Sequence, residues 1–169
     1  MCARSAHVYL TPFCPATERF AIFIMSDSTW PFPAVETIHL AAMVLLVASI
    51  SAFDLRLLGF ILKGERVSQL MRRLLPLTWI AFGTMAVTGV LLFSSDPVHK
   101  YCPNASFQLK LVLIPLAGLN MSLFHFTVYR SVAKWDTDQS PPFWAKMVGT
   151  ISVVLWAGVV VTGRWIGFI

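Results

Sequence analysis

The stretch Pro33–Leu58, PAVETIHLAAMVLLVASISAFDLRLL, decides the fold. A run of more than about 18 mostly apolar residues predicts a membrane-spanning helix, yet this run carries Glu36 and His39 near one end and Asp54 and Arg56 near the other. On a helix that turns about 100° per residue, Glu36, His39 and Asp54 share one face. Each ionisable group costs roughly 2.5–3.5 kcal/mol near the centre of a bilayer. This face should therefore point into a bundle rather than at lipid.

The composition agrees with a membrane protein. The 169 residues are 57% hydrophobic and 12% charged, whereas soluble domains usually hold about 25% charged residues. A chain this short and this apolar cannot bury its apolar surface in one soluble core. The formal net charge is +5, but the basic residues cluster beside the apolar runs, as topology signals do. We therefore expect the lipid bilayer, and not nucleic acid, to be the partner of the chain.

Four apolar runs predict an all-α protein, an integral membrane four-helix antiparallel bundle in one domain over residues 25–169. Residues 1–24 lack the pattern of a signal peptide, and Pro12 and Pro15 break any helix there. A polar start follows Met25, so we expect translation to begin at Met25 and residues 1–24 to be a non-native or disordered extension. The four spans are expected at about 33–58, 76–93, 107–129 and 143–165.

Two further patterns concern the second span. Before it, apolar residues recur at helical spacing beside three arginines, so this amphipathic segment should lie along the membrane surface or extend the second helix. The apolar residues are Val67, Leu70, Met71, Leu74 and Leu75. Within the span, Thr84 and Thr88 can each bond to a backbone carbonyl or to a neighbouring helix.

The loops predict an orientation. Loops 59–75 and 130–142 are rich in lysine and arginine, whereas the loop between the second and third spans has only Lys100, with Lys110 at its helical edge. Basic loops stay on the cytoplasmic side of a membrane. We therefore expect a multi-pass protein of the bacterial inner membrane, with both termini outside and the two basic loops in the cytoplasm.

This orientation sorts the polar residues of the spans into two layers. The outer layer contains Glu36, His39, Lys110 and Arg164, and the inner layer contains Asp54, Arg73, Asn120 and His125. Buried charges in lipid usually pair. The candidate pairs are Glu36 with Lys110 or Arg164 in the outer layer, and Asp54 with Arg73 or His125 in the inner layer. Both layers are candidate binding sites.

Histidine inside a membrane helix is a standard ligand of haem b or a proton relay. His39 and His125 should lie on the order of 20 Å apart along the membrane normal, so one haem cannot use both. A haem at His39 would need His99, Met43 or a histidine from another subunit. Glu36 and His39 are only two ligands, whereas zinc usually requires at least three from the protein, and His99 and Cys102 in the loop between the second and third spans could supply more. We nevertheless expect no metal site.

Three functions remain open at this point. The outer layer binds a redox cofactor, haem or quinone, or a membrane partner, which includes a second copy of the chain. Alternatively, the protein is a small ion- or proton-coupled transporter or an accessory subunit of one. In the third interpretation the buried charges only fix the bundle. No nucleophile–base pair, phosphate-binding loop or nucleotide fingerprint is present, so the sequence does not support an enzyme.

Several stretches resemble an uncharacterised bacterial family of small four-helix inner-membrane proteins. They cover most of residues 30–168 and read WPFPAVETIHL, FDLRLLG, RRLLPLTW, FQLKLVLIPLAGLNMSLFH and GRWIGF. The FQLKL…GLN segment is also loosely similar to the membrane domain of the copper-resistance D family, whose methionine and histidine pattern is not reproduced here. The resemblance implies a fold and a location, and it implies no activity.

Overall fold

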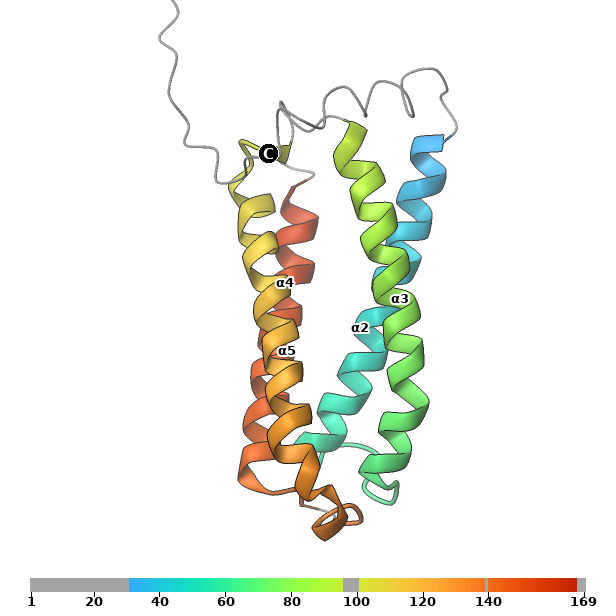
Figure 1. Cartoon of the computed structure of the whole chain (residues 1–169). Helices are drawn as coiled ribbons and strands as arrows, with labels where there is room; N and C mark the ends of the chain where they lie inside the picture. Colours follow the sequence, from blue (N-terminus) through green and yellow to red (C-terminus); the bar gives the residue numbers. More distant parts are fainter. Residues whose placement is uncertain (1–30, 96–100, 139, 167–169) are drawn as a thin grey trace, which may run out of the picture.

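The computed structural model describes residues 31–95, 101–138 and 140–166 (Figure 1). In these residues four helices are long and apolar enough to cross a membrane, so the protein is an integral membrane four-helix bundle. The expected extension over residues 1–24 lies outside the described residues. The helices are α2 (Pro31–Leu58), α3 (Val67–Ser95), α4 (Ala105–Leu123) and α5 (Phe143–Trp165), and α4 continues through a π-helical turn, η2 (Phe124–Val128), into a 3₁₀ helix, η3 (Tyr129–Lys134).

Local signals set the limits of the first two helices. Gly59 follows α2 with a φ of 78°, and the bonds from Gly59 N to Arg56 O (3.0 Å) and from Phe60 N to Leu55 O (3.0 Å) form a Schellman cap. The amphipathic segment extends α3 rather than lying on the membrane surface, since α3 begins at Val67. Pro76 therefore lies inside α3 and not in its first turn.

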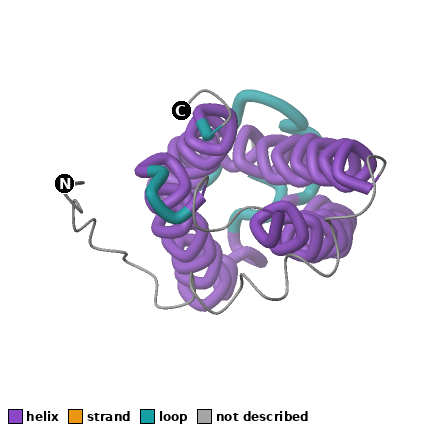
Figure 2. The backbone as a smooth tube through the Cα atoms, turned by 90° about the horizontal axis from the view of Figure 1, so that it is seen from above, coloured by secondary structure: helices purple, strands orange, loops and turns teal. Residues whose placement is uncertain are grey.

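The four helices run antiparallel as two hairpins. α2 packs along α3, α4 packs along α5, and the contact between α2 and α5 joins the two hairpins. α3 and α4 are not packed closely against each other. The view from above shows the four helices arranged around a common centre (Figure 2).

The junction between α2 and α5 depends on a buried glycine. A Cβ atom at Gly149 would lie 3.3 Å from the backbone oxygen of Asp54 and 3.3 Å from the Cβ atom of Leu57. Small residues of this kind let helix backbones approach closely in lipid. Within the second hairpin, Asn120 Nδ2 of α4 donates a hydrogen bond of 3.1 Å to the backbone oxygen of Val148 of α5.

A polar clasp closes the end of the bundle that carries the basic loops. Arg56 is fully buried (0% exposed). Its Nε donates to the backbone oxygen of Glu65 (3.1 Å), and one terminal nitrogen donates to the backbone oxygen of Asp138 (3.1 Å). The Asp136 carboxylate accepts bonds from the N–H and the hydroxyl of Ser68, both at 2.7 Å. Asp136 thus caps the first turn of α3 from the other hairpin.

Candidate functional site

A cavity of about 160 Å³ lies in the centre of the bundle, between the two hairpins. All four long helices contribute to its wall, which is mainly apolar and includes Phe53, Phe82 and Trp156. Five polar residues also line it: Ser49, Asp54, Thr78, Asn120 and Ser152. A mainly apolar wall with a few polar groups is typical of sites for small molecules.

Four of these polar residues satisfy their hydrogen bonds within the protein. The hydroxyl of Ser49 donates to the backbone oxygen of Leu46 (2.9 Å), and the hydroxyl of Thr78 lies 2.9 Å from the backbone oxygen of Leu74. Asn120 bonds across to α5, and Ser152 bonds to the Asp54 side chain. These bonds hold the helices together, and none of the four side chains has a buried nitrogen or oxygen atom without a hydrogen-bond partner.

Asp54 is the exception among the cavity-lining residues. Its side chain is 4% exposed, and its Oδ2 atom is buried without a hydrogen-bond partner. The Ser152 side chain provides a hydrogen bond to the carboxyl group from α5. Buried polar atoms in folded proteins almost always have a partner, because an unpaired one costs about 1–3 kcal/mol and more if it is charged. The Asp54 carboxyl group is therefore the polar group of the cavity wall that has a buried oxygen atom available to a ligand.

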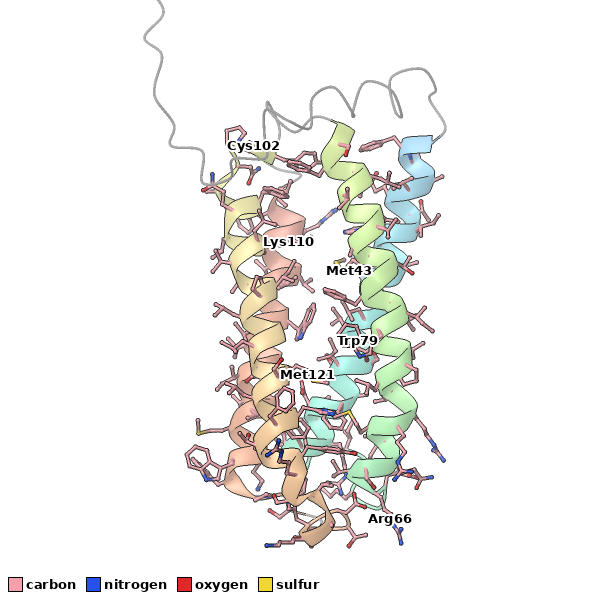
Figure 3. The ribbon with its side chains drawn as sticks, in the orientation of Figure 1. Met43, Arg66, Trp79, Cys102, Lys110 and Met121 are labelled. Carbon is pink, nitrogen blue, oxygen red and sulfur yellow. The ribbon has the colours of Figure 1, made fainter. Side chains whose placement is uncertain are left out.

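The cavity reaches the outer surface of the bundle on one side. Trp79 of α3 is 63% exposed, and Gly118 of α4 is also exposed, although both line the cavity. These residues flank the seam where α3 and α4 are not packed closely. Trp79 and Met121, another lining residue, approach this space from α3 and α4 (Figure 3). Since the outer surface of the spans faces lipid, a ligand can enter sideways from the bilayer.

A second polar group, formed by His39 and Lys110, lies nearer the other end of the bundle. His39 Nδ1 is 2.9 Å from Thr88 Oγ1. The Thr88 hydroxyl has one proton and lies 2.7 Å from the backbone oxygen of Thr84, which can only accept. When the Thr88 hydroxyl donates to Thr84, its oxygen accepts a hydrogen bond from His39 Nδ1 in the tautomer that carries the proton on Nδ1. The His39 imidazole also interacts with the backbone of Met85, which lies on α3 together with Thr88.

Lys110 of α4 approaches the same group from the opposite hairpin (Figure 3). Its positive charge acts on the His39 ring, and its side chain is half-buried. Its amine lies over Gly163 of α5, where a Cβ atom would be 3.2 Å from Nζ. Glu36, one turn from His39 on α2, also acts on the ring but is itself exposed. Arg164 is exposed at the same end of the bundle.

The structure thus brings together part of each predicted layer. In the inner layer, Asp54 and Asn120 line the cavity. Arg73 and His125 do not: Arg73 is exposed, and the His125 ring stacks on the Tyr129 ring with a distance of 5.1 Å between the ring centroids. The Asp54 carboxyl group bonds to Ser152 rather than to either cation. In the outer layer, the charges of Lys110 and Glu36 both act on the His39 ring, and Glu36 itself is exposed.

The sequence did not reveal Ser152 or Gly163. Gly149 and Ser152 lie three residues apart on one face of α5, and this pair of small residues is the signal that could have located Ser152. Thr88 bonds both to a backbone carbonyl and to a neighbouring helix, as its position in the second span predicted. Neither His39 nor His125 lines the cavity.

Among the described residues, no group of three or more histidine, cysteine, aspartate or glutamate side chains is arranged to hold a metal ion.

Comparison with known proteins places the chain in a family. No curated protein and no solved structure matches the chain. A family profile matches residues 32–169, which is most of the sequence and all four long helices apart from the first residue of α2. The chain belongs to the family of unknown function DUF6644.

Proposed function

We propose that this protein is a non-enzymatic binding protein of the bacterial inner membrane. Its ligand is a small lipophilic molecule whose polar head hydrogen-bonds to Asp54 inside the central cavity. The observation that supports this proposal best is the unpartnered Oδ2 atom of Asp54 in the wall of a mainly apolar cavity that reaches the lipid-facing surface.

The cavity limits the size of the head group. Its volume of about 160 Å³ is close to that of an engineered apolar cavity of about 150 Å³ that binds benzene. A single six-membered ring therefore fits inside. A longer apolar tail leaves through the seam between α3 and α4, past Trp79 and Gly118, into the bilayer.

The cavity also limits the chemistry of the head group. The Asp54 carboxyl group accepts hydrogen bonds when it is ionised and keeps acceptor capacity when it is protonated, so a head group that carries a hydroxyl or an amine can bind to either form. A quinol meets both requirements, since it has a single ring with two hydroxyl groups. Haem b is a poorer candidate, because neither histidine of the described spans lines the cavity.

Ion or proton transport receives less support. The cavity and the His39–Lys110 group are separated by an apolar cluster of Ala42, Leu46, Ala81 and Met85. A continuous polar path through one copy of the chain would have to cross this cluster. The resemblance to the copper-resistance D domain leads to no copper proposal, because among the described residues no group of three or more histidine, cysteine, aspartate or glutamate side chains could hold a metal ion.

A fluorescence titration tests the proposed function. The detergent-solubilised protein is titrated with a decyl-substituted benzoquinol and with its dimethyl ether, which has the same ring and tail but no donor. Trp156 lines the cavity, so the quenching that Trp156→Phe removes reports the cavity. We expect the quinol to bind about tenfold more tightly than the ether, because only the quinol donates a hydrogen bond to the Asp54 carboxyl group, and a tenfold difference corresponds to about 1.4 kcal/mol, within the range for one hydrogen bond.

Substitutions of two carboxylates provide the control. Asp54→Asn should weaken quinol binding about tenfold and leave ether binding unchanged. Asp138→Asn, which changes an exposed carboxylate outside the cavity, should alter neither. Equal affinities for the quinol and the ether in the wild-type protein would refute the role of Asp54.

A further inference from the structure

We propose that the loop between α2 and α3, residues 59–66, binds the head groups of anionic phospholipids together with two arginines near the start of α3. The loop contributes nothing to the wall of the central cavity. It presents large apolar side chains in succession to the outside of the bundle, those of Phe60, Ile61 and Leu62, and Phe60 is 71% exposed. Large apolar side chains that gather on an exposed surface outside the spans indicate an interaction site.

Hydrogen bonds hold the backbone of this loop in place. The loop begins with the Schellman cap at Gly59, and the N–H of Glu65 donates to the backbone oxygen of Leu62 (2.9 Å). Arg56 Nε of α2 donates to the backbone oxygen of Glu65 (3.1 Å). An ordered turn therefore presents the apolar side chains. A surface that is already ordered loses little conformational entropy when it binds a ligand.

Leu62 adopts a backbone conformation that leucine normally avoids. Its φ is 52°, in the left-handed region, where the Cβ atom of an L-residue lies too close to a carbonyl oxygen. Glycine and asparagine adopt this conformation more readily. Since the Leu62 side chain is exposed, packing inside the bundle does little to offset the strain. A contact between this side chain and lipid would offset it.

The length of α2 places the loop at the level of the lipid head groups. α2 has 28 residues and is therefore about 42 Å long, which matches a bilayer of about 40–45 Å with its head groups included. The loop that follows α2 directly thus lies beyond the hydrocarbon core. Phenylalanine and leucine side chains at this level bind a membrane by entering the boundary between head groups and acyl chains.

Two arginines of α3 lie at the depth of the lipid phosphates. α3 has 29 residues and is about 43 Å long, so it exceeds a hydrocarbon core of about 30 Å by roughly 7 Å at each end. Arg72 and Arg73 lie about 8–9 Å from the start of α3, at the edge of this core. Arginine side chains reach from such a position to the head groups, and a guanidinium group binds phosphate oxygens with two parallel hydrogen bonds.

The charges around the loop favour an anionic head group. The exposed cations of the loop and of the start of α3 are Lys63, Arg66, Arg72 and Arg73, and Figure 3 shows Arg66 at this end of the bundle. Between residues 59 and 73 the sequence has one carboxylate, that of Glu65. From the other hairpin, Asp136 is bonded to Ser68, and Asp138 is exposed. A surface that is both apolar and cationic matches a ligand that is both apolar and anionic, such as an anionic phospholipid.

Thermal unfolding in mixed micelles tests this proposal. The full-length protein in dodecyl maltoside is titrated with dioleoyl phosphatidylglycerol or with dioleoyl phosphatidylcholine, which has the same acyl chains and no net charge. A ligand that binds the folded state raises the melting temperature in a saturable way. We expect phosphatidylglycerol to bind about tenfold more tightly than phosphatidylcholine, since each cation near the lipid contributes to the attraction. Inorganic phosphate, which lacks the acyl chains, should leave the melting temperature unchanged.

Two pairs of charge substitutions locate the cations that matter. Arg72→Gln combined with Arg73→Gln should reduce the affinity for phosphatidylglycerol to that for phosphatidylcholine. Arg130→Gln combined with Lys134→Gln is the matched control, because it removes two exposed cations from the other hairpin at the same end of the bundle. This control should keep the preference of the protein for phosphatidylglycerol.

Substitutions in the loop test its apolar side chains. Phe60→Ser should weaken the binding of phosphatidylglycerol about tenfold, because it removes a large apolar surface from the contact. Phe143→Ser, which changes an equally exposed phenylalanine at the start of α5, should not. Leu62→Asn relieves the strain but removes the apolar group, so the melting temperature without lipid should not fall, while phosphatidylglycerol binding should weaken at least about threefold.

Three results would overturn the proposal. The first is equal affinity of the wild-type protein for the two lipids, or phosphatidylglycerol binding that survives either the Arg72 and Arg73 substitutions or Phe60→Ser. The second is a rise in melting temperature with inorganic phosphate as large as with phosphatidylglycerol, which would indicate a soluble anion. The third is a dimer in lipid-free micelles that Phe60→Ser dissociates, because a second copy of the chain would then cover the loop.

Discussion

Gly149 of α5 lies so close to Asp54 of α2 that a Cβ atom at position 149 would be 3.3 Å from the Asp54 backbone oxygen. This contact joins the two hairpins, and Ser152, almost one turn further along α5, bonds to the Asp54 side chain. The close approach of the two backbones therefore also determines where the carboxyl group lies in the wall of the cavity.

Gly149→Val should destabilise the bundle. The added atoms would meet backbone and Cβ atoms, which cannot rotate away, and overpacking of this kind costs about 1–3 kcal/mol. Gly83→Ala is the control, because a Cβ atom there meets nothing within 4 Å. Unfolding in mixed detergent measures both variants. A stability of Gly149→Val equal to that of the wild type would show that the helices are further apart than described.

Arg56→Met should also destabilise the protein. The side chain keeps most of its length but loses the donors that bind the backbone oxygens of Glu65 and Asp138. Hydrogen bonds that involve a charged group contribute about 1.5–3 kcal/mol, so a loss in that range is expected. Arg72→Met, at an exposed position, should change the same unfolding curve by less than about 0.5 kcal/mol.

Asp136 should make stability depend on pH in the acid range. Burial disfavours its charge, but the two bonds from Ser68 and the charges of Arg66 and Arg56 outweigh this effect and hold the pKa of Asp136 below its ordinary value. A carboxyl group with a lowered pKa stabilises the folded state above its ordinary pKa of about 3.9. This stabilisation is lost as the pH falls through the lower pKa of the folded state.

The difference between the wild type and Asp136→Asn isolates this contribution. We expect the melting temperature of the wild type to exceed that of the variant at pH 6, and the gap to narrow below about pH 4. Asp138→Asn, at a more exposed neighbour, should show no such narrowing. A gap that stays constant down to pH 2 would mean that Asp136 caps α3 without its charge.

The proposed orientation predicts the location of the loops. Green fluorescent protein fused after Lys63 or after Lys134 should fluoresce, because both positions lie at the end that carries the basic loops (Figure 1). The same protein fused to the C-terminus should be dark, and alkaline phosphatase fused there should be active. The opposite pattern of activities would reverse the orientation and place the His39–Lys110 group on the cytoplasmic side.

The number and approximate positions of the helices could be predicted from the apolar runs of the sequence. Four long runs located four helices, and the shared face of Glu36, His39 and Asp54 placed two of these residues inside the bundle. The second span was expected from about residue 76, with the amphipathic segment before it either on the membrane surface or as an extension of the helix. The extension is what the structure has, and Pro76 lies inside α3, because membrane helices tolerate proline in their interior.

The site was harder to predict because its contacts depend on how each helix is rotated. The inner layer suggested that Asp54 pairs with Arg73 or His125, whereas the rotation of α5 brings Ser152 to the carboxyl group. Spacing along one helix gives the face of a residue and not the partner that it meets. For the same reason the sequence did not indicate that Gly89 and Gly163 make room for His39 and Lys110.

The infrared spectrum of the Asp54 carboxyl group tests the central claim most directly. Protein labelled with ¹³C at its aspartate carboxyl groups is measured with and without the decyl-substituted benzoquinol, and Asp54→Asn identifies the Asp54 band. We expect the quinol to shift this band to a hydrogen-bonded frequency and its dimethyl ether to leave the band unchanged. A band that stays unchanged while the quinol quenches Trp156 would contradict the account, because the ligand would then bind without contacting Asp54.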